Sequence, residues 1–343
     1  NTTTNTTNCL FVGTHREIEK KILSQTEFEH VPLSVEPVAN ITRHPLRFLM
    51  RNRNAYCSAK KILQRTSVKC VVGLGGMASL SVLYAAKKLS LPVLLMEQNI
   101  VLGRANRWFS KHAKGIALTF AETEGIKPAT SKLTSVTGNP VRHDIAMLHQ
   151  SSLMSNEPSP PTLLVLGGSQ GATAINRVVM KTIKQIEPRQ KANWHIVHQT
   201  GVHQEQEIIE FYQQQNISHT VAPFFSEMAP LYQSASLVIS RAGATTLAEL
   251  ACTGSPAILI PYPNSVRDHQ RKNARYFEQA GAARIVEQQD NPTQTAKQLS
   301  NVLSMLFSDK TELTSMQKAM HAIAIPDAAA WVVKMITEIT TVL

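Results

Sequence analysis

Short apolar runs alternate with longer amphipathic segments along most of this chain. In the longer segments apolar residues recur at helical spacing, which predicts helices packed on one face. Short apolar runs between such helices predict the buried strands of parallel sheets, so we expect an α/β fold. The expected strands are 9–12, 69–72, 92–96, 115–119, 133–136, 163–166, 195–198, 220–222, 237–239, 257–260 and 283–285, and the expected helices are 16–24, 78–89, 172–186, 245–251, 273–280 and 327–340.

A stretch rich in serine and proline interrupts this alternation near the middle of the chain. Pro158, Pro160 and Pro161 are too dense for a helix or a central strand, so we expect a linker between two similar halves. Two Rossmann-like parallel-sheet domains facing a central cleft place a ligand at the carboxyl ends of their strands. The expected parts are an N-terminal domain at 1–145, a linker at 146–161, a C-terminal domain at 162–325 and a final helix at 326–343 that packs back on the N-terminal domain.

Three of the expected strands end in glycine-rich loops, at 72–76, 165–172 and 240–246. A loop of this kind that opens into a helix leaves backbone N–H groups unpaired and adds the positive end of the helix dipole. Such a place suits a phosphate or a diphosphate, and Ser169 adds a hydroxyl to the second loop. The alternative for each loop is a tight strand-to-helix turn without a ligand. The three loops together indicate a nucleotide-type ligand.

Several polar side chains follow these loops and strand ends. Glu249 stands about one turn into the helix after the third loop, where a carboxylate can accept ribose hydroxyls. It is otherwise a solvated helix residue or the partner of Thr246 in a capping box. Gln270 and Asn273 offer amide groups, which suit neutral sugar hydroxyls. Asn99 follows a strand end and either binds a ligand or caps a loop.

The chain of 343 residues has a net charge of +11, which indicates an anionic partner. It contains no zinc finger, no aromatic pair of the RNA-binding type and no dense basic block with interleaved aromatics, so nucleic acid is not expected. An anionic lipid or a phosphorylated substrate fits better. Segments 43–53 and 106–111 mix cations with large apolar residues, as peripheral proteins do where they bind anionic membranes. The alternative is ordinary helices that bury their Leu and Phe in the core.

The cysteines and histidines indicate neither a disulfide framework nor a metal site. The four cysteines are widely separated, and the histidines lack the spacing of zinc ligands. We expect reduced thiols in a cytoplasmic compartment. Every apolar run is too short to span a bilayer. The first eight residues are polar and low in complexity, and we expect a longer N-terminal region before them.

Seven short motifs follow one another in a definite order, at 13–19, 75–76, 97–99, 138–142, 167–172, 243–249 and 268–274. This order resembles the MurG family of glycosyltransferase family 28. The resemblance implies a GT-B fold, no metal and no cofactor. It implies inverting transfer of GlcNAc from UDP-GlcNAc to the MurNAc C4 hydroxyl of lipid I, which gives lipid II for peptidoglycan synthesis. It also implies a peripheral enzyme on the anionic cytoplasmic face of the bacterial plasma membrane. Other proteins of cell-wall synthesis or cell division are candidate partners.

The resemblance further implies roles for single residues. Glu249 binds the ribose, Arg142 lies near the uracil, and Phe225 lies beside the base. Gln270 and Asn273 contact the GlcNAc hydroxyls, and Asn99 faces the sugar from the other domain. The diphosphate and the rest of the donor contact Ser169 and the helix start formed by Ala244, Thr245, Thr246, Leu247 and Ala248.

The chain departs from the family pattern in two respects. Met77 and Met96 stand where the family has Tyr and His, so we do not expect the acceptor contacts that the resemblance implies for Tyr and His at these two positions. The family also has a glycine-rich loop with a His before the first matching motif, and this sequence lacks it. That loop holds a candidate catalytic base in the family, so the catalytic residue is not identified from this sequence, and Glu97 and His269 are the fallback candidates. The alternative functions are another GT-B UDP-sugar enzyme, such as a glycolipid glycosyltransferase or an epimerase, and a non-catalytic UDP-sugar-binding relative.

Overall fold

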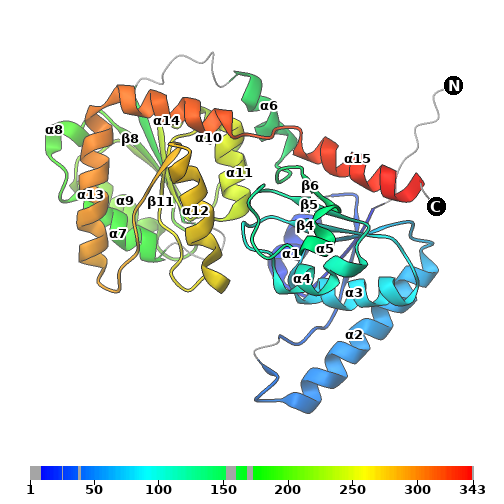
Figure 1. The fold of residues 1–343 in the computed structure, drawn as a ribbon. Helices are drawn as coiled ribbons and strands as arrows, with labels where there is room; N and C mark the ends of the chain where they lie inside the picture. The colour runs from blue at the N-terminus through cyan, green and yellow to red at the C-terminus, as the bar shows by residue number, and fades with distance from the viewer. Residues whose placement is uncertain (1–8, 25, 38–39, 152–159, 168–172, 342–343) are drawn as a thin grey trace. The chain divides into compact units, whose positions relative to one another are not determined.

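The computed structural model describes residues 9–24, 26–37, 40–151, 160–167 and 173–341. The chain forms two compact α/β units (Figure 1). Unit 1 consists of Asn1–Glu97, Leu102–Val136 and Trp331–Leu343, and unit 2 consists of Gln98–Val101 and Thr137–Ala330.

Unit 1 contains two parallel sheets. A two-stranded sheet pairs β1 with β2, and a four-stranded sheet runs β3-β4-β5-β6 in chain order. The strands are β1 (Leu10–Gly13), β2 (Glu29–Pro32), β3 (Val71–Gly73), β4 (Val93–Glu97), β5 (Gly115–Leu118) and β6 (Thr134–Val136), and the helices are α1 (Glu17–Leu23), α2 (Pro45–Arg65), α3 (Gly76–Lys88), α4 (Arg104–Phe109), η2 (Ser110–His112) and α5 (Pro128–Ser131).

The four-stranded sheet of unit 1 is covered on both faces. Successive side chains of a strand point to opposite faces, so Leu95 packs in the cluster around α3, while Leu94 packs with α15 (Ala328–Thr341), the red helix in Figure 1. A Cβ atom on Gly115 would lie 3.1 Å from side-chain atoms of both Leu94 and Ile339. A larger residue at this position of β5 would therefore crowd the helix that covers it.

Unit 2 contains one parallel sheet of six strands in the order β12-β11-β10-β7-β8-β9. The strand order reverses between β7 and β10, because the chain adds β8 and β9 on one side of β7 and then β10 on the other. Open α/β sheets bind ligands in the crevice at the carboxyl ends of two such strands. The strands are β7 (Thr162–Leu166), β8 (His195–Gln199), β9 (His219–Ala222), β10 (Leu237–Ser240), β11 (Ala257–Leu259) and β12 (Ala283–Ile285).

The helices of unit 2 enclose this sheet. Leu163 and Val165 of β7 are fully buried and belong to one core with residues of α7 and α13, which lie side by side (Figure 1). Apolar runs such as β7 are typical of strands covered on both faces. The helices are α6 (His143–Ser151), α7 (Thr173–Ile183), α8 (Pro188–Lys191), α9 (Glu205–Gln214), α10 (Ala229–Ser234), α11 (Ala244–Thr253), η3 (Val266–Asp268), α12 (His269–Gln279), α13 (Pro292–Ser308) and α14 (Lys310–Ala322).

The α/β fold expected from the sequence is confirmed, and every expected strand and helix overlaps an observed one. Strand β2 was not predicted, because its sequence, Glu-His-Val-Pro, is not an apolar run. Helix α2, with 21 residues, was not predicted either, because apolar side chains in its first half are exposed. Within the expected linker at 146–161, residues up to Ser151 continue α6, and 152–159 lie outside the described residues.

The described residues contain neither a membrane-spanning helix nor a cluster of metal-ligating side chains. None of their helices has the length and apolar character needed to cross a bilayer. Their His, Cys, Asp and Glu side chains include no group of three that could hold a metal ion.

Candidate functional site

The reversal of strand order in unit 2 places the loops after β7 and β10 at the carboxyl ends of two neighbouring strands. The loop after β7 begins at Gly167, and Ser169 lies outside the described residues. The loop after β10 connects Ser240 to α11. In that loop Arg241 donates through Nη1 to the Ile260 carbonyl oxygen at 3.0 Å, which ties the loop to the end of β11.

Helix α11 begins with exposed polar main chain. Gly243 is its N-cap and supplies no side-chain hydrogen bond, and the Gly243 carbonyl accepts from the Leu247 N–H at 2.9 Å. The N–H groups of Ala244, Thr245 and Thr246 precede this first helical hydrogen bond. Among the described residues, a Cβ atom on Gly243 would have only Thr246 Oγ1 within 4 Å, at 3.9 Å. N–H groups that precede the first helical hydrogen bond, together with the helix dipole, suit a phosphate group.

The next two residues of α11 offer a ligand little polar surface. Leu247 is fully buried and its N–H is used within the helix. Ala248 is half-buried and has only a methyl side chain. We therefore expect these residues to shape the helix start through packing, while hydrogen bonds to a ligand come from the turn before them.

Glu249 lies at the centre of a polar cluster beside this helix start. The Tyr232 hydroxyl donates to Glu249 Oε2 at 2.8 Å, and Arg142 Nη2 lies 3.6 Å from Glu249 Oε1. The second guanidinium nitrogen of Arg142 donates to the Ser226 carbonyl oxygen at 3.4 Å. A solvated Glu249 is excluded because its side chain is 13% exposed. A capping box is excluded because Gly243 is the N-cap.

The cluster keeps a buried carboxylate beside one cation. Burial raises the pKa of Glu249, while the hydrogen bond from Tyr232 and the charge of Arg142 act in the opposite direction. Burial and then the Glu249 charge raise the pKa of Tyr232 well above its ordinary value, so its hydroxyl remains a donor. A carboxylate in this setting is an acceptor for hydroxyl groups.

The backbone of the segment after β9 contacts the same cluster. The Phe225 N–H donates to Gln199 Oε1 at 3.4 Å, and Ser226, the next residue, accepts from Arg142. Arg142 and Phe225, which the resemblance assigns to the uracil, are therefore linked by the hydrogen bond from Arg142 to the residue that follows Phe225. The Glu249 carboxylate joins them through Arg142.

Helix α12 carries the two amides expected to contact a sugar. Gln270 Oε1 accepts from the Tyr262 N–H at 2.9 Å, which leaves the side-chain NH2 group as a donor. Asn273 is fully buried, its Oδ1 accepts from the Ile100 N–H at 3.0 Å, and its Nδ2 donates to Asn99 Oδ1 at 3.1 Å. We therefore expect Asn273 to position the segment Gln98–Val101, which belongs to the same unit.

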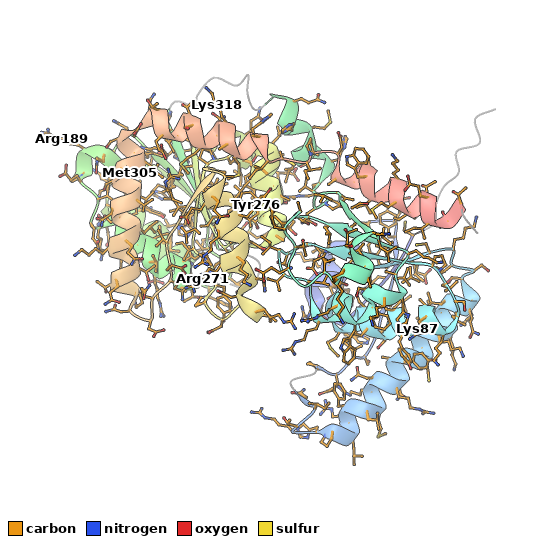
Figure 2. All side chains as sticks on the ribbon, in the orientation of Figure 1. Lys87, Arg189, Arg271, Tyr276, Met305 and Lys318 are labelled. Carbon is orange, nitrogen blue, oxygen red and sulfur yellow. The ribbon has the colours of Figure 1, made fainter. Side chains whose placement is uncertain are left out.

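Arg271 lies between these two amide residues in the sequence of α12. Arg271, labelled in Figure 2, donates through Nε to a carboxylate oxygen of Glu287 at 2.8 Å. Its second acidic neighbour is Asp268, at 3.7 Å. These pairs hold the exposed side of the helix start.

The two candidate bases have different surroundings. The Nδ1 of His269 donates to the Val266 carbonyl oxygen at 2.7 Å, so neutral His269 keeps Nε2 as an acceptor. Glu97, in unit 1, is 4% exposed, and its Oε2 accepts from the Gly103 N–H at 2.7 Å and from Asn106 Nδ2 at 2.9 Å. These bonds favour a structural role for Glu97 at the start of α4.

Sequence analysis missed two residues of this site, Tyr232 and Gln199. Their partners lie 17 and 26 residues away along the chain, and no motif surrounds either of them. Tyr232 stands in a six-residue helix, and Gln199 ends a strand. A polar residue at the carboxyl end of a parallel strand was the available signal for Gln199.

Comparisons with known proteins agree with this architecture. Residues 162–331 match the glycosyltransferase family 28 C-terminal domain, and residues 3–118 match its N-terminal domain. The chain is 34% identical over 332 residues to a protein of Hahella chejuensis named UDP-N-acetylglucosamine–N-acetylmuramyl-(pentapeptide) pyrophosphoryl-undecaprenol N-acetylglucosamine transferase. That match covers 95% of this chain and 89% of the relative.

Two solved structures are similar as well. The crystal structure of Acinetobacter baumannii MurG has a TM-score of 0.72 and 29% identity, covering 95% of this chain and 90% of the other. The UDP-GlcNAc 2-epimerase from Neisseria meningitidis has a TM-score of 0.64 over 96% and 91% of the two chains, but at 15% identity this likeness concerns the fold alone. Both halves of the chain and its close relatives therefore lead to one conclusion: the chain belongs to glycosyltransferase family 28.

Proposed function

We propose that this chain transfers GlcNAc from UDP-GlcNAc to the MurNAc C4 hydroxyl of lipid I, with inversion, and so forms lipid II. The observation that carries the proposal is the polar cluster of unit 2, in which Arg142 contacts both Glu249 of α11 and the backbone of Ser226, the residue after Phe225. This cluster lies on the helix whose N-cap, Gly243, supplies no side-chain hydrogen bond. The name of the Hahella chejuensis relative supports the donor and the acceptor.

Each part of the donor has a partner in this cluster. The diphosphate binds the first N–H groups of α11, because these groups and the helix dipole are positive. The ribose hydroxyls donate to the Glu249 carboxylate, and the uracil lies beside Phe225 and Arg142. Gln270 offers its NH2 group to the GlcNAc hydroxyls.

The reaction replaces one bond at the anomeric carbon with another. The C4 oxygen of MurNAc forms a bond to C1 of GlcNAc and gives its proton to a base, while the bond from C1 to the phosphate oxygen breaks and UDP leaves. The negative charge that develops on the diphosphate is stabilised by the start of α11. His269 fits the base better than Glu97, because its Nε2 is an acceptor while the Glu97 carboxylate already binds two donors.

A lipid acceptor requires the protein to work at a membrane surface, and α2 offers a suitable face. Leu46, Leu49 and Met50 are 75%, 64% and 65% exposed, so a helix that buries these residues in the core is excluded. In unit 1 the Trp108 side chain is 78% exposed as well. Exposed apolar side chains on a basic chain suit the anionic cytoplasmic face of the bacterial plasma membrane.

The cations of α2 do not all contribute to that face. Arg51 Nη1 lies 3.0 Å and Arg47 Nε lies 3.4 Å from Glu36 Oε2, and Glu36 is buried. Charge reversal at Arg47 or Arg51 would therefore disturb the fold of unit 1 together with any lipid contact. Apolar substitutions are the cleaner probe of membrane binding.

The proposal is tested by incubating the chain with UDP-GlcNAc in the presence and in the absence of a lipid I analogue. We expect UDP release that depends on the analogue. UDP release or a change of the sugar without the analogue would indicate the epimerase alternative and contradict the proposal.

A further inference from the structure

Tyr232 places a buried hydroxyl against the Glu249 carboxylate. Tyr232 is 2% exposed, and its hydroxyl donates to Glu249 Oε2 at 2.8 Å. The short helix α10 that carries it packs against α6, α11 and β7, so the direction of the ring is set by packing on several sides. The hydroxyl is thus held in place independently of any ligand.

This contact uses only part of what the carboxylate can accept. A carboxylate has two oxygens and about four lone-pair sites, and the bond from Tyr232 uses one of them. Oε1 faces Arg142 at 3.6 Å, which is longer than a direct hydrogen bond. As far as the described residues are concerned, acceptor sites therefore remain on both oxygens for two neighbouring hydroxyls.

We propose that Tyr232 is a positioning residue for the donor, because its hydroxyl fixes the Glu249 carboxylate in the orientation that accepts the ribose hydroxyls. This inference rests on the proposed function, since it takes Glu249 as the ribose acceptor. A phenol held by packing restricts the carboxylate more than water could, and a preorganised acceptor loses less entropy when a ligand binds.

The same bond also affects the charge of Glu249. Burial raises the pKa of Glu249, and the hydrogen bond from Tyr232 lowers it, followed by the charge of Arg142. Loss of the Tyr232 hydroxyl therefore raises the pKa of Glu249 further. As the pH falls, the carboxylate is then protonated earlier, and the affinity that depends on it is lost at a higher pH.

Other titratable groups surround α11 and must be separated from this effect. Asp144 of α6 raises the pKa of Glu249. Burial raises the pKa of Cys252, on α11 itself, to about 11, and the Glu249 charge adds to this. The stacked imidazoles of His149 on α6 and His321 on α14 lie near the Cys252 backbone. A comparison of two ligands that differ only in the ribose hydroxyls cancels the contributions of these groups.

The test is calorimetric titration of the full chain with UDP and with 2′,3′-dideoxy-UDP across a range of pH. The variants are Tyr232→Phe and, as a matched control, Tyr212→Phe. Tyr212 also has a fully buried hydroxyl in unit 2, but that hydroxyl bonds His198 Nδ1 at 2.8 Å. Both variants lose one buried hydrogen bond, and only Tyr232→Phe loses it at Glu249.

We expect the wild type and Tyr212→Phe to prefer UDP to the dideoxy ligand to the same degree and with the same pH course. In Tyr232→Phe the preference should fall about tenfold near neutral pH, as expected for a hydrogen bond to a charged group, and should vanish at a higher pH than in the wild type. A Tyr232→Phe preference equal to the wild type's at every pH would overturn the inference and leave the role of Glu249 standing. A wild type without any preference would instead contradict the ribose part of the proposed function.

A second measurement keeps the inference testable if Tyr232→Phe does not fold. Wild-type protein labelled with 3-fluorotyrosine is titrated with both ligands and followed by 19F NMR. We expect one tyrosine resonance to shift with UDP and to stay in place with 2′,3′-dideoxy-UDP. Identical spectra with the two ligands would overturn the inference.

Discussion

Replacement of Glu249 by alanine is the most direct perturbation of the donor cluster. In the proposed complex the carboxylate accepts two ribose hydroxyls, and hydrogen bonds to charged groups contribute about 1.5–3 kcal/mol each. The lower figure for both bonds together is about 3 kcal/mol, so we expect the Kd for UDP to rise at least about a hundredfold.

The same substitution has a cost in the free protein. It removes the acceptor of the Tyr232 hydroxyl and the partner of Arg142. An unsatisfied buried hydroxyl costs about 1–3 kcal/mol of folding free energy, which is partly offset because a buried charge is removed. Glu249→Gln keeps an acceptor for Tyr232 and is expected to be the more stable of the two variants.

The assay is calorimetric titration with UDP, with thermal unfolding measured on the same samples. Glu210→Ala removes an exposed glutamate of the same unit and serves as the control, with UDP affinity unchanged. A folded Glu249→Ala variant that binds UDP as tightly as Glu210→Ala would refute the assignment of the ribose to this carboxylate.

Three further predictions concern other parts of the chain. Leu46→Glu with Leu49→Glu should weaken binding to phosphatidylglycerol vesicles more than about tenfold, while Val202→Glu, at an exposed site of unit 2, should not; equal binding would exclude α2 from the membrane contact. Gly115→Val should lower the free energy of unfolding in urea by about 1–3 kcal/mol through crowding against α15, and an unchanged midpoint would argue against that packing. Burial lowers the pKa of His198 to about 3, below its value in the unfolded chain. The unfolded chain therefore binds a proton at His198 first, and the free energy of unfolding decreases as the pH is lowered. From about pH 7.5 to about pH 5.5 the wild type should lose about 1.4 kcal/mol more than His198→Gln, and an equal loss in both proteins would contradict the buried neutral imidazole.

The sequence predicted the sheets well because their strands are apolar on both faces. Strands such as β4 and β7 each contain four consecutive apolar residues, and glycine-rich sequences follow β7 and β10, before the next helices begin. The exceptions have local causes. Strand β2 carries charged and polar residues, and α2 turns apolar side chains outward, so neither shows the expected pattern.

The site was predictable only where its residues stand in motifs. Arg142, Phe225 and Glu249 were found because each belongs to a short motif, and Arg142 contacts both Glu249 and Ser226, the residue after Phe225. Tyr232 could not be found, because its role depends on a hydroxyl brought to Glu249 by the packing of α10. The fully buried amide of Asn273 also holds the segment Gln98–Val101, a contact that its residue type alone does not predict, while its contact with the sugar stays a prediction.

Transfer of labelled GlcNAc from UDP-GlcNAc to a lipid I analogue tests the central claim most directly, with UDP binding measured on the same sample. We expect a product in which GlcNAc is attached in β linkage to the C4 oxygen of MurNAc, and a large loss of that product in Glu249→Ala. UDP binding without any transfer would contradict the claim that this chain carries out the reaction.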